Sequence, residues 1–113
     1  MSSSRYFIET DLEAYLIYIA SVRNLSSNTV ESYKRDLLKL VKYLQELGIT
    51  SYSETTESVC SSWIGNLFAA NNNPKSIQRH LSSAKGFFKF LLKNQIIESS
   101  PFDLISGPKA AKH

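Results

Sequence analysis

Residues 73–94 read NPKSIQRHLSSAKGFFKFLLKN, and this stretch decides the fold. Asn73 can cap a helix, and Pro74 fits the first helical position because a helix needs no N–H there. From that start the apolar residues recur at helical spacing and form one face, which consists of Ile77, Leu81, Ala84, Phe88 and Leu91. The sequence therefore predicts an amphipathic helix that ends near Asn94.

The opposite side of this helix is basic. At ~100° per residue one stripe carries Lys75, Arg79, Ser82, Gly86, Lys89 and Lys93. Residues 71–97 hold five basic residues and no acidic one, so the stripe lacks the acidic partners of an ordinary solvated helix. The charge pattern supports two interpretations equally: a surface for a polyanion, or a solvated face that keeps the protein soluble.

Further helices are predicted on both sides of this stretch. One covers about residues 11–23 after a cap at Thr10, one follows the cap Ser26 and ends near Gly48, and one covers residues 57–70 after Thr55 and Thr56. A short last helix is expected from Ser100 and Pro101, with Phe102, Leu104 and Ile105 on it. The inward residues of the earlier helices are Leu12, Tyr15, Leu16, Ile19, Val30, Tyr33, Leu37, Leu40, Val41, Leu44, Leu47, Val59, Trp63 and Leu67. The fold class is all-α, a compact bundle of four main helices plus a short C-terminal helix.

Composition agrees with one small globular domain. The chain has 113 residues, of which 42% are hydrophobic and 20% charged, and its net charge is +3. Cys60 is the single cysteine, so no intrachain disulfide can form, and a reducing, cytoplasmic compartment is expected. No apolar run approaches the ~18 residues of a membrane span. We expect residues 1–107 to form the domain and residues 108–113 to begin a linker.

The helix that follows Ser26 has polar residues in its first turn. Its exposed N–H groups can attract phosphate, and short hydroxyl or amide side chains can reach phosphates or base edges. Serine and threonine at a helix start are more commonly simple caps, which is the better interpretation of Ser26. Ser27, Asn28 and Ser32 are needed less for capping, so they are the better candidates for contacts.

No catalytic or metal site is evident in the sequence. His80 has no near partner at metal-ligand spacing, and it fits either a flank of the basic helix or a DNA-side contact. Cys60 lies in a predicted helix and is interpreted as buried filler, and Trp63 as core. No glycine-rich phosphate loop occurs, and no cofactor is expected.

Three stretches together resemble a known family. Leu25 to Thr29, followed by Tyr33, Asp36 and Leu37, is similar to the LSxNTxxxYxxDL stretch of tyrosine recombinases. Residues 75–91 are similar to their SxxRxLSAxRxFYxFL helix, and residues 94–109 to their xGxIxxNPxxxIxxPK ending. The ordered set covers roughly residues 8 to 110. It resembles the N-terminal core-binding domain, also called SAM-like, of a Xer-type recombinase or phage integrase.

The resemblance implies a function for the basic face. In this family the domain and a C-terminal catalytic domain form a clamp around duplex DNA, and its second and fourth helices face the DNA. Asp36 is expected to pair with a neighbouring cation that the sequence does not identify. The candidate DNA-binding residues are Ser27, Asn28, Thr29, Ser32, Lys34, Arg35, Lys75, Ser76, Gln78, Arg79, Ser82, Lys85 and Lys89.

The sequence departs from the family pattern at two positions, and two alternative functions remain open. Ser27 stands where the family usually has proline, and Gln95 stands where it has a helix-ending glycine. Since the family's catalytic residues lie in the C-terminal domain, this chain is expected to bind double-stranded DNA but not to cut it. It is expected to be monomeric alone, whereas the parent recombinase assembles as a tetramer on DNA. The alternatives are a helical module whose basic face docks an acidic protein, and a stand-alone DNA-binding regulator.

Overall fold

The computed structural model describes residues 3–70, 73–103 and 105, and for residues 3–9 only the backbone. Within these residues the chain is helical and contains no strand, which confirms the all-α class. The elements are α1 Ser3–Ser21, α2 Ser27–Glu46, the 3₁₀ helix η1 Tyr52–Glu54, α3 Glu57–Ala69 and α4 Pro74–Lys93. The predicted linker, residues 108–113, lies outside the described residues.

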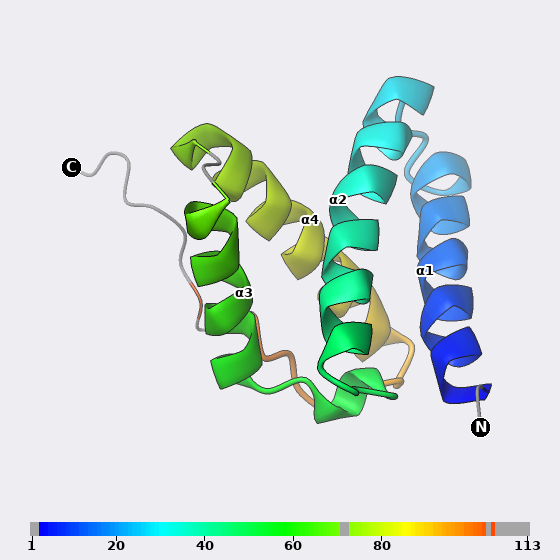
Figure 1. Ribbon diagram of the computed structural model, residues 1–113. Helices are drawn as coiled ribbons and strands as arrows, with labels where there is room; N and C mark the ends of the chain where they lie inside the picture. The colour runs from blue at the N-terminus through cyan, green and yellow to red at the C-terminus, as the bar shows by residue number, and fades with distance from the viewer. Residues whose placement is uncertain (1–2, 71–72, 104, 106–113) are drawn as a thin grey trace.

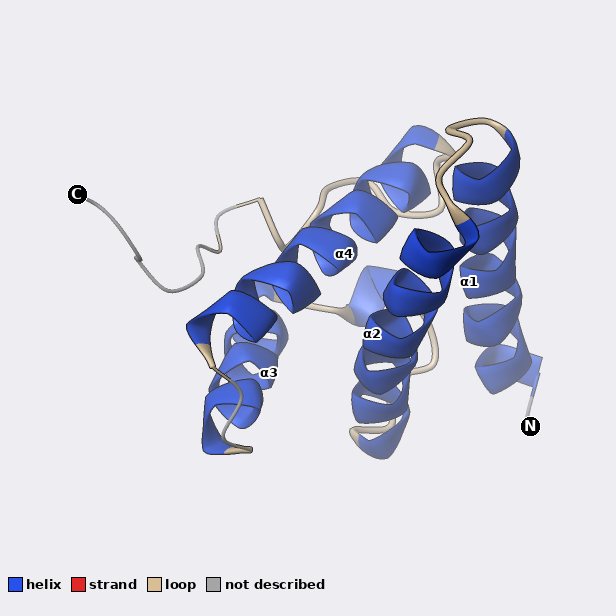
Figure 2. Ribbon diagram, turned by 90° about the horizontal axis from the view of Figure 1, so that it is seen from above, coloured by secondary structure: helices blue, strands red, loops and turns tan. Residues whose placement is uncertain are grey.

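The other three α-helices are arranged around α4. Figure 1 shows α1 and α2 running side by side, with α3 on the far side of the molecule from α1. Figure 2 shows α4 crossing the bundle at an angle to α2, with one end near α3 and the other near α1. Because α4 packs against α1, α2 and α3, its apolar side lies at the centre of the domain.

Local capping explains where three of the helices begin. The side chains of Ser26, Thr56 and Asn73 each accept a hydrogen bond from a backbone N–H three residues later, at distances of 3.2, 3.2 and 2.8 Å. Pro74 occupies the start of α4. The predicted starts of α2, α3 and α4 are therefore confirmed.

Two predicted boundaries at the ends of the chain are wrong. α1 begins at Ser3 rather than after Thr10, because residues 3–10 contain neither glycine nor proline and the helix continues through the predicted cap. The short last helix is a turn over the described residues, in which Asp103 N–H donates to the Ser100 carbonyl and Ile105 N–H to the Phe102 carbonyl. Both of these hydrogen bonds join residues three apart, which is the pattern of a turn and not of an α-helix. Leu104 lies outside the described residues.

Aromatic rings fill the centre of the bundle. Phe87 and Phe88 of α4 are fully buried, and the Tyr52 ring of η1 meets both edge-on, with centroid distances of 5.2 and 5.6 Å. Phe102 packs on Phe88 at 4.9 Å, and Tyr15 of α1 packs on Phe87 at 5.3 Å. The turn around Phe102 is therefore part of the core.

Most of the predicted core is confirmed, with one exception on α2. Leu47 is half exposed because it forms the C-terminal cap of α2 instead of part of its packed face. Asp36, which the periodicity did not place in the core, is buried.

Replacing Leu37 by alanine should destabilise the domain by about 2–5 kcal/mol, because Leu37 is fully buried and its loss leaves a cavity. The neighbouring Leu38 is 45% exposed, so Leu38→Ala is a matched control that should change the free energy of unfolding by less than about 0.5 kcal/mol. Urea unfolding monitored by circular dichroism gives both values. Equal effects would contradict the assigned face of α2.

The end of α4 contains a residue in a left-handed conformation. Gln95 has φ +63°, and the Gln95 and Ile96 N–H groups donate to the Leu92 and Leu91 carbonyls. The same pattern ends α2, where Gly48 has φ +79° and Ile49 N–H donates to the Leu44 carbonyl. Glycine suits this position because it has no Cβ, so Gln95 adopts it at a cost in strain.

Gln95→Gly should therefore stabilise the domain by roughly 0.5–1 kcal/mol. This value is the strain energy of the left-handed conformation that the substitution removes, minus the conformational entropy that glycine loses on folding. Gln95→Ala keeps a Cβ in the same conformation and should bring no such gain. Thermal and urea unfolding of the two variants measure the difference. A stabilisation of the same size in both would mean that strain at φ +63° is not its source.

Candidate nucleic-acid interface

The candidate contact residues occupy two crossing helices, as the sequence predicted. On α2 Ser27, Asn28, Lys34 and Arg35 are exposed, while Thr29 and Ser32 are partly buried. On α4 Ser76 is partly buried, and the exposed candidates are Lys75, Gln78, Arg79, Ser82, Lys85 and Lys89. All thirteen lie within α2 or α4, and none is in the core.

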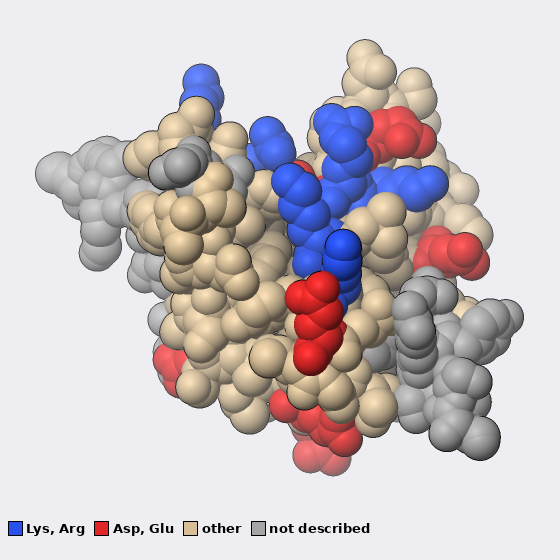
Figure 3. Space-filling model, in the orientation of Figure 1, with Lys and Arg blue, Asp and Glu red and all other residues tan. Residues whose placement is uncertain are grey.

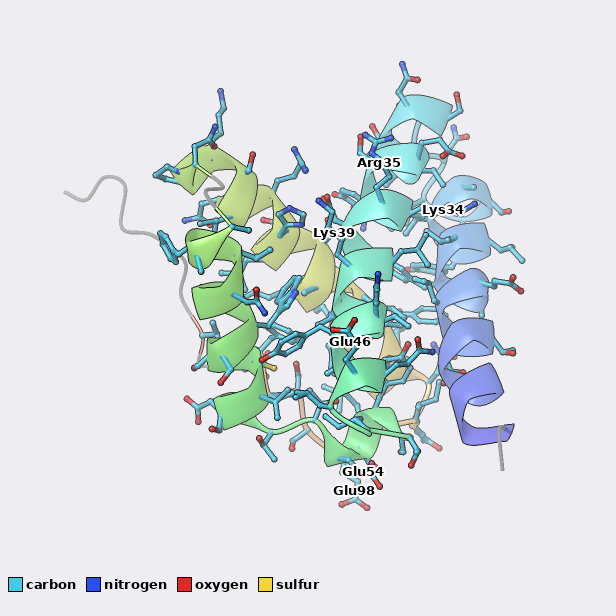
Figure 4. The ribbon with its side chains drawn as sticks, in the orientation of Figure 1. Lys34, Arg35, Lys39, Glu46, Glu54 and Glu98 are labelled. Carbon is cyan, nitrogen blue, oxygen red and sulfur yellow. The ribbon has the colours of Figure 1, made fainter. Side chains whose placement is uncertain are left out.

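The basic side of α2 differs in detail from the prediction. Arg35, Lys39 and Lys42 follow one another at helical spacing and are exposed. Figure 4 shows Lys39 on the side of α2 toward α4, whereas Lys34 extends toward α1. Lys39 and Lys42 belong to this surface and were missed. Their spacing of four and seven residues from Arg35 was the signal that could have identified them.

These cations form a group on one face of the surface. Figure 3 shows Lys and Arg side chains gathered over α2 and toward the upper end of α4, with acidic side chains beside them at the upper right and others at the lower edge. Glu46 bounds the basic group at the lower part of α2, and Glu54 and Glu98 lie below it (Figure 4). The lower edge of this face therefore carries carboxylates, whereas lysine and arginine predominate over α2 and the upper end of α4.

An ion pair joins the two helices where they cross. Arg79 donates from Nε to Oδ2 of Asp36 and from Nη2 to Oδ1, both at 2.9 Å. Ser83 Oγ donates to Oδ2 at 3.3 Å. The carboxylate is buried, whereas the Arg79 side chain is half exposed. The cation expected for Asp36 is thus Arg79, and this candidate contact residue also has a structural role.

His80 lies beneath this pair and does not contact the surface. It is buried against Trp63, with the ring centroids 6.2 Å apart, so the interpretation as a DNA-side contact is wrong. Its Nδ1 is 3.2 Å from Asp36 Oδ1 but has no aligned hydrogen-bond partner in the described part of the chain. Burial lowers the pKa of His80, while Asp36 opposes the shift and Arg79 and Lys39 add to it.

Helix capping occupies some of the backbone N–H groups in the first turns of α2 and α4 that could otherwise bind a phosphate. The Thr29 N–H is taken by the Ser26 hydroxyl, and the Ser76 N–H is taken by the Asn73 side chain. The Ser26 hydroxyl also donates to Thr29 Oγ1 at 2.9 Å. These two backbone N–H groups are therefore already occupied, and the exposed cationic donors of this surface are lysine and arginine side chains.

The basic stripe of α4 continues to its packing with α1. Lys89 and Lys93 border a hollow of about 350 Å³ together with Arg23, and Tyr15 and Gly86 also line it. A Cβ at Gly86 would lie 2.8 Å from the Tyr15 hydroxyl, so the glycine permits this close approach. Burial raises the pKa of Tyr15 to about 12, so its hydroxyl stays protonated.

The described residues contain no cluster of metal-ligating side chains. None of their histidine, cysteine, aspartate and glutamate side chains form a group of three that could hold a metal ion. Cys60 is buried, and burial raises the pKa of its thiol to about 12, which confirms its interpretation as filler. No described helix is both long and apolar enough to cross a membrane.

The lowered pKa of His80 predicts a pH-dependent stability. The fold lowers the pKa of His80, so between about pH 7 and 5 the folded chain is protonated there to a smaller extent than the unfolded chain, whose imidazole titrates near the ordinary pKa of 6.5. The free energy of unfolding should therefore fall as pH decreases from about 7 to 5. His80→Gln should remove that part of the slope, as denaturant unfolding at several pH values would reveal. Identical slopes in both proteins would contradict the prediction.

Comparison with known proteins places this arrangement in a family. The profile of the family described as "Phage integrase, N-terminal SAM-like domain" matches residues 12–95. Tyrosine recombinase XerC of Pseudomonas syringae pv. syringae (strain B728a) is 30% identical over 105 residues, which are 93% of this chain and 35% of that protein. Tyrosine recombinase XerD of Staphylococcus haemolyticus (strain JCSC1435) is 33% identical over 105 residues, 93% of this chain and 36% of that protein.

The match is therefore broad for this chain but partial for its relatives. The chain spans about a third of the length of these recombinases. No solved structure matches it. Because the family profile covers residues from α1 through the end of α4, the chain belongs to the phage integrase N-terminal SAM-like domain family.

Proposed function

We propose that this chain binds duplex DNA as the core-binding domain of a site-specific tyrosine recombinase. The observation that carries the proposal is the basic face of α4, since residues 71–97 hold five lysine or arginine residues and no acidic one. Where α4 crosses α2, the exposed Arg35, Lys39 and Lys42 of α2 add to this face, and Glu31 and Glu46 are the exposed carboxylates of α2. Asp36, the carboxylate at the crossing, is buried and occupied by Arg79. A polyanion laid across both helices would relieve the repulsion between these cations.

In this proposal the chain forms one half of a clamp around the duplex. The other half, and the residues that break and rejoin DNA through a phosphotyrosine link, belong to a catalytic domain that this sequence does not span. The names of the relatives, tyrosine recombinases, support that assignment. Other recombinase subunits on the same DNA are the expected protein partners.

Contacts of two kinds are proposed within the surface. Arg35, Lys39, Lys75 and Lys85 would bind phosphates and position the domain without regard to sequence. Ser27 and Asn28, exposed in the first turn of α2, would approach base edges. Asn28→Ala should then reduce discrimination among sites more than affinity for DNA in general.

The experiment is fluorescence anisotropy of the whole chain on a labelled duplex across a salt series. Each phosphate contact contributes a slope near 0.9 in a plot of log affinity against log salt. The double variant Arg35→Gln/Lys75→Gln removes one cation from each helix, so it should reduce the slope by roughly 2 and weaken binding to all sequences alike.

A charge-matched variant separates local contacts from net charge. Ser61 on α3 and Ser99 beyond α4 are exposed and outside the basic group. Ser61→Glu/Ser99→Glu changes the net charge by the same amount as the lysine and arginine variant but should leave the slope nearly unchanged. An equal loss in both variants, or no binding of the unaltered chain even at low salt, would overturn the proposal and favour the acidic-protein partner.

A further inference from the structure

Within the described part of the chain, the carboxylate of Asp36 is held by side chains of α4. These are Arg79 Nε and Nη2 at 2.9 Å, Ser83 Oγ at 3.3 Å, and His80 Nδ1 at 3.2 Å without hydrogen-bond alignment. Asp36 is 2% exposed and belongs to α2. It therefore fixes the position of α4 side chains from beneath the basic surface.

The geometry of the pair determines which way Arg79 can bind. Two-point pairing through Nε and Nη2 fixes the plane of the guanidinium, because the group is a rigid fork of five N–H donors. Two donors are directed to Asp36, which leaves one on Nη2 and two on Nη1. The Arg79 side chain is 50% exposed, so these remaining donors lie at the edge away from the buried carboxylate.

We propose that Asp36 is a positioning residue for DNA binding, which holds the Arg79 guanidinium so that its outer edge is presented to a DNA phosphate. The inference rests on the function proposed above. A free arginine side chain must be immobilised when it binds, and a guanidinium already fixed by Asp36 avoids much of that cost. The pair also gives Arg79 an orientation suited to two-point phosphate recognition.

Positioning and charge alone predict opposite effects of neutralising Asp36 on the affinity for DNA. A carboxylate close to the bound polyanion repels it, so removal of its charge should strengthen binding if Asp36 only contributes electrostatically. If Asp36 positions Arg79, its neutralisation should weaken binding although the protein becomes more positive. The two interpretations therefore give opposite results for one substitution.

The test compares Asp36→Asn with Glu31→Gln, each a change from carboxylate to amide on α2. Glu31 is exposed and four residues before Arg35, so it lies near the same stripe but pairs with nothing that orients Arg79. Anisotropy titrations with one duplex should show binding weakened about two- to tenfold by Asp36→Asn, and equal or tighter binding for Glu31→Gln. Equal or tighter binding by Asp36→Asn would overturn the proposal.

A double-mutant cycle separates positioning from a general effect on folding. In the Arg79→Gln background, Asp36→Asn should no longer weaken binding, because there is no guanidinium to orient. Circular dichroism melting defines a temperature at which every variant is folded.

If Asp36→Asn does not fold, Arg79→Lys is the variant to test. It keeps the positive charge but loses the two-point pairing with Asp36, so unchanged affinity for DNA would overturn the proposal. Failure of the unaltered chain to bind DNA would instead reject the proposed function.

Discussion

Phe87 and Phe88 are fully buried in α4, and rings from α1, η1 and the turn at Phe102 pack on them. This aromatic contact holds elements from the whole chain around one helix. Its burial removes a large apolar surface from water, which is the main source of stability in such a small domain. Because the packed side of α4 is fixed in this way, the opposite side must face solvent.

The same helix thus supplies both the centre of the core and the basic surface. A helix at the edge of a bundle could present cations without constraint, but α4 is held by three other helices. Its cations keep a defined orientation relative to those of α2. Asp36 and Arg79 reinforce this relation at the crossing, where the half-exposed guanidinium of Arg79 pairs with the buried carboxylate of Asp36.

Sequence reasoning predicted the features that depend on neighbours in the chain. The caps Ser26, Thr56 and Asn73 and the apolar faces of α2 and α4 follow from local hydrogen bonding and helical periodicity. The burial of Asp36, His80 and Tyr52 was not predictable in this way, because each depends on groups far away in sequence. Asp36 and Arg79 are separated by 43 residues, and no periodicity within either helix identifies the partner of the other.

The uneven distribution of charge over the surface has a consequence for the approach to a ligand. Cations gather over α2 and the upper end of α4 and outnumber the carboxylates beside them, whereas Glu54 and Glu98 lie at the lower edge. The domain therefore carries an electric dipole in addition to its net charge of +3. In the field of a polyanion such a molecule is rotated before it touches, so that encounters begin with the basic face forward. The rate of association, and not only the final affinity, would then depend on ionic strength.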